Sequence, residues 1–120
     1  MANLNDKIKE LLEIDGSLCA AMVDSKNGML LASAGSGVDI EIAAAGNTDV
    51  LRAKMKTINL LGLNDKVSDI LITLEKQYHI IKPLHSVEGI FIYLVLDVRN
   101  SNLALARRKV SDFESTIQDI

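Results

Sequence analysis

Three apolar runs in the second half of the chain constrain its fold most strongly, because only short polar breaks separate them. The runs are Val67–Leu74, Tyr78–Leu84 and Ile90–Leu96. A parallel crossover would need about a dozen residues or more, so these runs are predicted to be antiparallel strands joined by tight turns. An antiparallel sheet with one face in water alternates apolar and polar residues, and these runs are apolar at both parities. The sheet is therefore predicted to be covered on both faces.

Alternation along the runs predicts which side chains share a face, because successive side chains of a strand point to opposite faces. The even-numbered apolar residues, from Ile70 to Leu96, are expected on one face. The odd-numbered ones, from Leu71 to Val95, are expected on the other.

The first half of the chain predicts a helix followed by a hairpin. Apolar residues at helical spacing place the helix over about Asn3–Glu13, with Asn3 as its N-cap. Leu18–Val23 and Met29–Ala32 are then predicted strands. The Asn27-Gly28 pair between them is a strong hairpin signal, because both residue types tolerate positive φ.

Two further helices flank the three apolar runs. The first runs from about Ile40 to Leu61, with Asp39 as its N-cap and Gly62 directly after it. The second follows a cap at Asn100 or Ser101. Its apolar stripe consists of Leu103, Ala106, Val110, Phe113 and Ile117.

The predicted order of elements is α-β-β-α-β-β-β-α, an α/β (α+β) arrangement. The first and last helices each have a single apolar stripe, which suits them to one face of the sheet. The middle helix must then cover the other face. We therefore expect a three-layer α/β/α sandwich around a five-stranded antiparallel sheet, with residues 1–120 forming a single domain.

Composition excludes several classes of function. Aromatic residues make up 3% of the chain and Trp is absent, which argues against a surface that stacks bases or sugars. The formal net charge of −3 gives no basic footprint for nucleic acid. The single cysteine, Cys19, lies in an apolar run and is predicted to be a small buried side chain. The sequence shows no signal segment and no membrane-length apolar stretch, so a cytoplasmic location is expected.

The predicted middle helix has more apolar and small surface than one sheet contact requires. Ile40, Ala44, Leu51, Met55 and Ile58 form a stripe that can lie on the sheet. A second stripe of small residues faces away from it. Gly46 within this second stripe costs about 1 kcal/mol relative to alanine, which a helix tolerates more readily where another backbone comes close. The alternative is that Gly46 is neutral or fits a side chain of the sheet. The second stripe contains Ala43, Gly46, Val50, Ala53 and Thr57.

The strand over Val67–Leu74 gives independent support for an interface. It can lie at a sheet edge, yet Asp69 is its only charge, whereas edge strands are usually protected by lysine, proline or a covering element. Pro83 lies in the neighbouring strand instead, where we expect irregular pairing. A bare edge beside a small-faced helix predicts a two-fold dimer, with Val67, Asp69 and Leu71 in its interface.

Residues able to support catalysis or metal binding are few. His79 and His85 are six residues apart, with no cysteine or carboxylate at a familiar ligand spacing, so a structural or surface role is favoured.

Gly35-Ser36-Gly37 could hold an anion before a helix, but it lacks the lysine and glycine frame of a P-loop, so a linker is the better interpretation. Arg107-Arg108-Lys109 is typical of a solvated helix face, and Asp49 with Arg52 of a surface pair. We predict no catalytic residue, no cofactor and no metal ligand.

An ordered set of short motifs resembles the roadblock/LC7 domain family over about Leu4 to Phe113. Each motif alone is weak, and their order and spacing carry the resemblance. They are Ile14-Asp15-Gly16, Gly28-Met29, Ala43-Ala44-Ala45-Gly46-Asn47-Thr48-Asp49, Ile70-Leu71-Ile72-Thr73, Gln77-Tyr78-His79, Gly89-Ile90-Phe91 and Asn102-Leu103-Ala104-Leu105-Ala106-Arg107.

The resemblance implies a profilin/roadblock-like fold and homo- or heterodimers built by the second helix and third strand, with one sheet continuous across two chains. Family members are non-enzymatic partners of Ras-like small GTPases or adaptors on motors and signalling platforms. Stand-alone bacterial members are often associated with a GTPase of the gliding or polarity type. The resemblance therefore implies a regulatory or scaffold homodimer for a Ras-like GTPase. The alternative is an adaptor dimer that docks a kinase, receptor or cytoskeletal protein, and an enzyme would require chemistry at His79 or His85.

Two surfaces are candidates for partner binding. Pairing of two middle helices would leave one composite polar surface across the two-fold axis, which predicts one partner per dimer. The alternative site is the last helix, with Arg107 and Arg108, and either set could equally be solvated surface. The composite surface contains Glu41, Thr48, Arg52, Lys56 and Asn59.

Overall fold

The computed structural model describes residues 3–117. Its helices are α1 (Leu4–Ile8), α2 (Ile40–Leu60) and α3 (Leu103–Ser115), with two 3₁₀ turns, η1 (Lys9–Glu13) and η2 (Val98–Asn100). Its strands are β1 (Ser17–Asp24), β2 (Met29–Gly35), β3 (Ile70–Thr73), β4 (Gln77–Pro83) and β5 (Ile90–Asp97).

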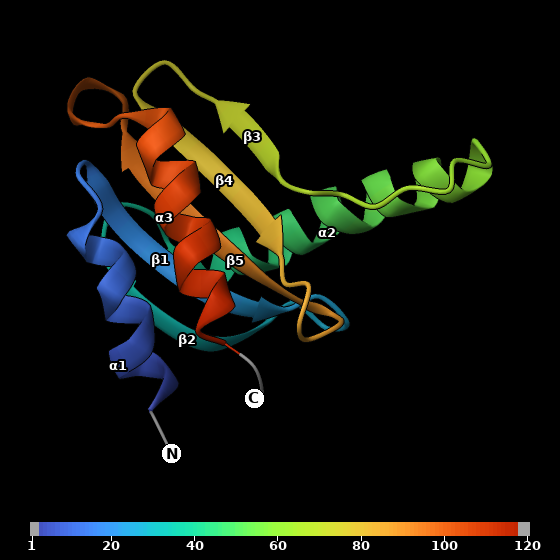
Figure 1. Cartoon of the computed structure of the whole chain (residues 1–120), viewed down its shortest axis with the longest axis horizontal. Coiled ribbons are helices and arrows are strands. Elements are labelled where there is room, and N and C mark those ends of the chain that lie inside the picture. The colour runs from blue at the N-terminus through green and yellow to red at the C-terminus, as the bar shows by residue number, and fades with distance from the viewer. Residues whose placement is uncertain (1–2, 118–120) are drawn as a thin grey trace.

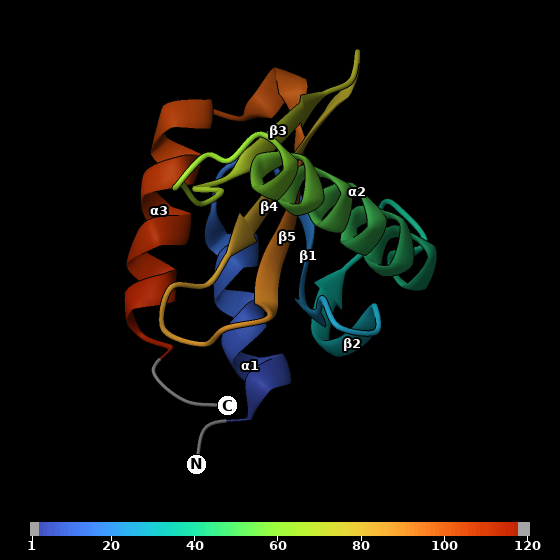
Figure 2. The ribbon, with the colours of Figure 1, turned by 90° about the vertical axis from the view of Figure 1, so that its right-hand side faces the viewer.

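The five strands form one antiparallel sheet in the order β2-β1-β5-β4-β3 (Figure 1). Helices α1 and α3 cover one face and α2 covers the other (Figure 2). The predicted α/β/α sandwich, its element order and its sheet are therefore confirmed. No helix within residues 3–117 is long and apolar enough to cross a membrane.

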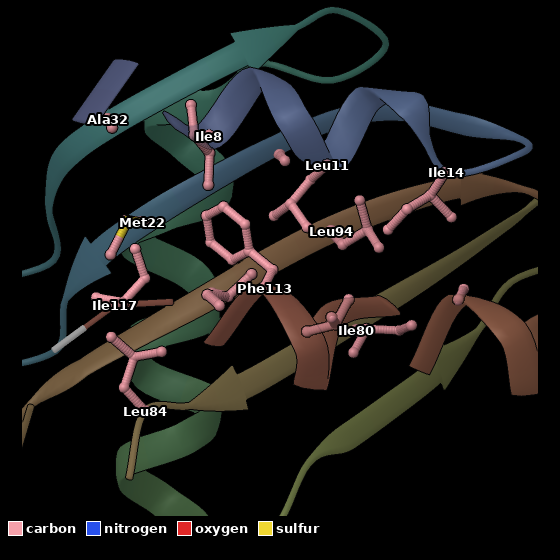
Figure 3. Close-up of a cluster of buried hydrophobic side chains, with 14 of the residues drawn as sticks. Ile8, Leu11, Ile14, Met22, Ala32, Ile80, Leu84, Leu94, Phe113 and Ile117 are labelled. Atoms are coloured by element: carbon pink, nitrogen blue, oxygen red, sulfur yellow. The ribbon is translucent and has the colours of Figure 1, made fainter. Parts of the chain in front are cut away.

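Two separate cores hold these layers together. On the α1/α3 side, residues such as Leu11, Leu94 and Phe113 pack in one cluster (Figure 3). On the α2 side, Ala44 and Leu51 pack on odd-numbered residues of β4 and β5. The apolar stripe predicted for the last helix is confirmed, because its members from Ala106 to Ile117 are buried and Leu103 packs against them.

Strand β3 differs from prediction in length and in parity. It covers only Ile70–Thr73, and it pairs Ile70 with Ile81 and Leu71 with Ile80. Ile70 therefore lies on the α2 face with the odd-numbered residues of the next strands, and Leu71 lies on the opposite face. The predicted grouping of even-numbered residues is wrong for this strand. Register depends on turn geometry, and a slip of one residue moves every side chain to the other face.

The structure identifies the residues that form several helix caps and turns. Asn3 caps α1 by accepting from the Asn5 N–H, but the helix tightens into η1 after Ile8. The cap of α3 is Asn102 and not the predicted Asn100 or Ser101, because its side chain accepts from the Leu105 N–H. In the β1–β2 turn only Gly28 has positive φ, at 76°. The caps predicted from Asp39 and Gly62 at the ends of α2 are confirmed.

Pro83 does not disturb the pairing that was expected to be irregular around it. The β4–β5 ladder runs in one register from Gln77 to Pro83. The Leu84 N–H donates to the Ile90 carbonyl across that ladder, so the nitrogen of Pro83 faces the β3 side. Strand β3 extends only to the partner of Ile81 and does not reach Pro83. The missing N–H therefore costs no ladder hydrogen bond.

Helix α2 is longer than the sheet it covers, and its C-terminal half extends past the sheet beside the segment that leads to β3 (Figure 1). Met55 was expected against the sheet, but its side chain is 49% exposed because the sheet ends before it. A cleft of about 410 Å³ lies beneath this overhang, lined among others by Met55, Val67 and Leu84.

Candidate interaction surface

The outer side of α2 is an exposed stripe of small and apolar residues. Ala43 is partly buried, whereas Gly46, Ala53 and Thr57 are exposed and Val50 is 39% exposed. Leu60, one turn beyond Thr57, continues the stripe and is 78% exposed. The six residues that we call the α2 stripe are Ala43, Gly46, Val50, Ala53, Thr57 and Leu60.

The surroundings of position 46 within its own chain do not require a glycine. A β-carbon at this position would have no neighbour within 4 Å among the described residues 3–117, and Gly46 has no positive φ. Glycine in mid-helix lowers helix stability by about 1 kcal/mol relative to alanine. An advantage outside the protomer, such as the close approach of another backbone, would offset that cost.

The second part of the surface is the open edge of β3. Ile70 and Ile72 lie on the α2 face, and no lysine or proline interrupts the strand. The Leu74 N–H donates to the Gln77 carbonyl of β4, so by alternation the N–H groups of Leu71 and Thr73 point away from β4. These groups are free to pair with another strand.

The segment before β3 is held by α3. Asp69, expected as an interface charge, accepts two hydrogen bonds from Arg107, at 2.9 Å from Nε and 3.2 Å from Nη2. Arg107 belonged to the basic cluster predicted as a solvated face, and its exposed side chain is instead paired with Asp69. Val67, also predicted for the interface, packs partly buried on the α2 side.

A buried ion pair lies beside this segment, and sequence reasoning missed it. Lys82 Nζ is 3.7 Å from Glu114 Oε1, with both side chains 9% exposed. Lys82 also donates to the Ser68 carbonyl at 3.3 Å, and Glu114 Oε2 accepts from the His85 N–H at 2.5 Å. The signal available in the sequence was a lysine inside the apolar run that became β4. These contacts join α3, β4 and the segment before β3.

One residue of the predicted polar surface is misplaced. Thr48 is only 3% exposed, and its hydroxyl donates to the Ala44 carbonyl at 2.7 Å. It follows Ala44 by four residues and therefore lies on the same, sheet-facing side of α2. Glu41, Arg52, Lys56 and Asn59 are exposed as predicted.

The two histidines have different environments. His79 lies on β4 beneath α2, where Tyr93 Oη is 2.9 Å from Nδ1 and Gln77 Oε1 is 2.8 Å from Nε2. Burial lowers the pKa of His79. His85 is exposed in the turn between β4 and β5. The structure does not bring the two together, and residues 3–117 hold no group of three or more side chains suited to a metal ion.

Two other predicted features are structural. Cys19 is buried on the α2 side of the sheet, and burial raises the pKa of its thiol. In the Gly35-Ser36-Gly37 segment, Gly35 ends β2 and the Ser36 N–H donates to the Leu18 carbonyl at 3.0 Å. That hydrogen bond ties the segment to β1, in line with a linker role.

Solved structures of very different sequence share this architecture. A roadblock/LC7 domain from Streptomyces avermitilis superposes with a TM-score of 0.84 at 11% identity, covering 98% of this chain and 96% of that one. Myxococcus xanthus MglB also gives 0.84, at 19% identity, covering 98% and 94%. The gliding protein MglB from Thermus thermophilus gives 0.79 at 16% identity, covering 94% and 84%. No protein-family model and no curated protein matches the sequence. The chain therefore has the fold of roadblock/LC7 domains.

Proposed function

We propose that residues 1–120 form one roadblock/LC7-like domain that acts as a homodimer, a non-enzymatic regulator or scaffold for a Ras-like small GTPase in the cytoplasm. The observation that supports the dimer is that two exposed features lie on the same side of the molecule. Helix α2 exposes a small-residue face, and β3 exposes an unprotected edge. A second copy of the chain would cover both.

The α2 stripe fits a second copy of itself. When two such helices are placed antiparallel, Ala43 faces Leu60, Gly46 faces Thr57 and Val50 faces Ala53 of the other chain. In each pair a smaller residue meets a larger one, and the two-fold symmetry of an isologous contact forms every pair twice. Leu60, the most exposed large apolar side chain within residues 3–117, would be covered in this arrangement.

Proline at Thr73 is expected to weaken the dimer and spare the protomer. The Thr73 N–H points to the open edge, so its loss removes no bond to β4, and proline is tolerated on edge strands for this reason. A second β3 would lose a hydrogen bond and meet the proline ring. We expect Thr73→Pro to raise the dimer dissociation constant by about tenfold, equivalent to about 1.4 kcal/mol. Sedimentation equilibrium measures this, with Thr73→Ala as control. Equal association of both variants would contradict edge pairing.

The GTPase partner comes from the resemblance to the roadblock/LC7 family, whose stand-alone bacterial members are often associated with a GTPase of the gliding or polarity type. The fold shared with MglB, which one matched structure names a gliding protein, is in line with that type. We propose binding of a Ras-like GTPase encoded in the same genome, tested with the purified proteins by calorimetry and by rates of GTP hydrolysis and nucleotide exchange. Binding with a change in either rate supports a regulator. Binding without a change supports a scaffold. Absence of binding to every such GTPase would favour the adaptor alternative.

The partner is proposed to bind the polar side of α2 across the two-fold axis. Arg52 and Lys56 are exposed there. Along α2, Glu41 precedes them and Asn59 follows them. Thr48 is left out because it is buried. We expect Arg52→Glu to weaken partner binding by about tenfold or more, since charged contacts at interfaces are sensitive to reversal. Arg108→Glu on α3 is the matched reversal on the opposite layer, measured in the same titration after both variants are shown to fold. Normal binding by Arg52→Glu with loss in Arg108→Glu would place the partner on α3.

A further inference from the structure

We propose that His79 makes the dimer sensitive to pH: proton uptake by its imidazole loosens the contact between α2 and the sheet and weakens association of the two chains. This inference rests on the proposed homodimer. It would make that interface respond to pH, because His79 lines a depression together with Ala43 and Gly46 of the α2 stripe.

Four side chains lie in a chain of contacts from helix to sheet, and hydrogen bonds join three of them, Tyr93, His79 and Gln77. Asn47 of α2, 9% exposed, contacts the hydroxyl of Tyr93 on β5. Tyr93 Oη is 2.9 Å from His79 Nδ1, and their rings meet edge to face at a centroid distance of 5.5 Å. His79 Nε2 is 2.8 Å from Gln77 Oε1 on the same strand. The chain therefore links α2, β5 and β4.

This arrangement suits a neutral imidazole. Nε2 faces an amide oxygen and must donate to it, which leaves Nδ1 as the acceptor for the Tyr93 hydroxyl. Burial raises the pKa of Tyr93 to about 12, so its hydroxyl keeps its proton throughout the physiological range. Protonation of Nδ1 would place two donors face to face and create a charge beneath the helix. Tyr93 would then have to turn its hydrogen away, with Asn47 already at the same oxygen.

The chain opens onto the proposed interface. A depression of about 270 Å³ between α2 and β4 is lined by Ala43 and Gly46 of the α2 stripe and by Asn47, His79 and Tyr93. In the antiparallel pairing above, Leu60 of the second copy lies over Ala43 at this depression. Covering it with an apolar side chain removes water from His79, and the dimer therefore disfavours the charged imidazole more than the monomer does.

Among residues 3–117, few charged groups are placed to stabilise an imidazolium at His79. Asp39 lines the depression, but its carboxylate accepts from the Ile42 N–H at the helix cap. On β5, Asp97 pairs with Gln77 and accepts from the Asn100 amide, and on β1 the Cys19 thiol is held neutral by burial. The residue of β3 opposite His79 is Ile72. On α2, Lys54 lies two turns beyond Asn47 and is exposed.

The direction of the pH effect follows from linkage. Burial lowers the pKa of His79 in the folded chain, so folding favours the neutral form. In the proposed dimer, the second copy would bury His79 further and favour the neutral form again. The stabilisation is present above the ordinary histidine pKa of about 6.5 and is lost as pH falls through the lowered value. For association the reference state is the folded monomer, so each protomer contributes up to about a tenfold rise in the dissociation constant per pH unit between the lowered pKa of the monomer and the still lower pKa in the dimer.

The test is sedimentation equilibrium of the full chain between about pH 7.5 and about pH 5, a range that spans histidine titration. We expect the wild-type dissociation constant to rise by about tenfold or more, with far-UV circular dichroism unchanged. His79→Gln should remove this dependence, and His85→Gln, at the exposed histidine, should keep it. Tyr93→Phe removes the donor to Nδ1 and should move the transition to higher pH, so the test does not depend on His79→Gln alone.

The results that would contradict the role of His79 differ from the result that would contradict the dimer itself. A wild-type dimer with a pH-independent dissociation constant, or a dependence that survives His79→Gln or vanishes in His85→Gln, overturns the role of His79 and leaves the dimer intact. Loss of far-UV signal together with association overturns it too, because the proton would then act on the whole fold. A wild-type protein that is monomeric at every pH overturns the proposed dimer and this inference together.

Discussion

Replacing Gly46 with leucine is expected to weaken the dimer while leaving the protomer at least as stable as the wild type. Within one chain the added side chain meets open space, and it improves helix propensity by about 0.5–1 kcal/mol. In the dimer the same side chain must fit between two helices, and overpacking of this kind costs about 1–3 kcal/mol. The dissociation constant should therefore rise by roughly 5- to 150-fold.

The opposite signs of the two effects make this variant informative. Sedimentation equilibrium gives the dissociation constant, and denaturant unfolding at a concentration where both proteins are monomeric gives protomer stability. Ala104→Leu is the matched control, because it adds the same bulk at an exposed helical position on the opposite layer. Equal weakening by the control, or unchanged association of Gly46→Leu, would remove the α2 stripe from the interface.

Replacing Lys82 with methionine is expected to produce the largest loss of stability. It leaves the carboxylate of Glu114 buried without its charge partner, which typically costs about 3–5 kcal/mol. This is a large share of the roughly 5–15 kcal/mol that stabilises a domain. Urea unfolding of the variant measures the loss.

Two comparisons separate this effect from general damage to the sheet. Adding Glu114→Gln to Lys82→Met removes the stranded charge and should restore part of the lost stability. Asp69→Asn breaks the more exposed pair with Arg107 and should cost less than about 1 kcal/mol. A double variant less stable than Lys82→Met alone would show that the pair does not act as a unit.

The architecture could be predicted from the sequence because several local signals agree. The short breaks between the last three runs permit only antiparallel neighbours, and apolar residues at both parities require two covering layers. Single apolar stripes on the flanking helices then assign the layers. Caps at Asn3 and Asp39 were visible because each directly precedes a helical pattern.

The sequence could not predict the register of β3 or the point at which the sheet ends beneath α2. Strand β3 is apolar at both parities, so nothing in it distinguishes the α2 face from the α3 face until the turn to β4 is known. The exposure of Met55 depends on where the sheet ends beneath α2, which is a tertiary property.

The candidate surface shows the same division between local and tertiary information. Its small stripe was visible from helical spacing alone. Thr48 was placed on the wrong side because it is polar, whereas its hydroxyl is satisfied by the Ala44 carbonyl and it can be buried. The hydrogen bonds through His79 join β4 to β5 beneath α2, and no local pattern signals them.

The mass of the wild-type protein in solution tests the central claim most directly. Sedimentation equilibrium at tens of micromolar, a concentration at which interfaces of about 1 µM affinity are well populated, should give twice the 13.1 kDa of one chain. A mass of 13.1 kDa at that concentration would contradict a dimer built on α2 and β3.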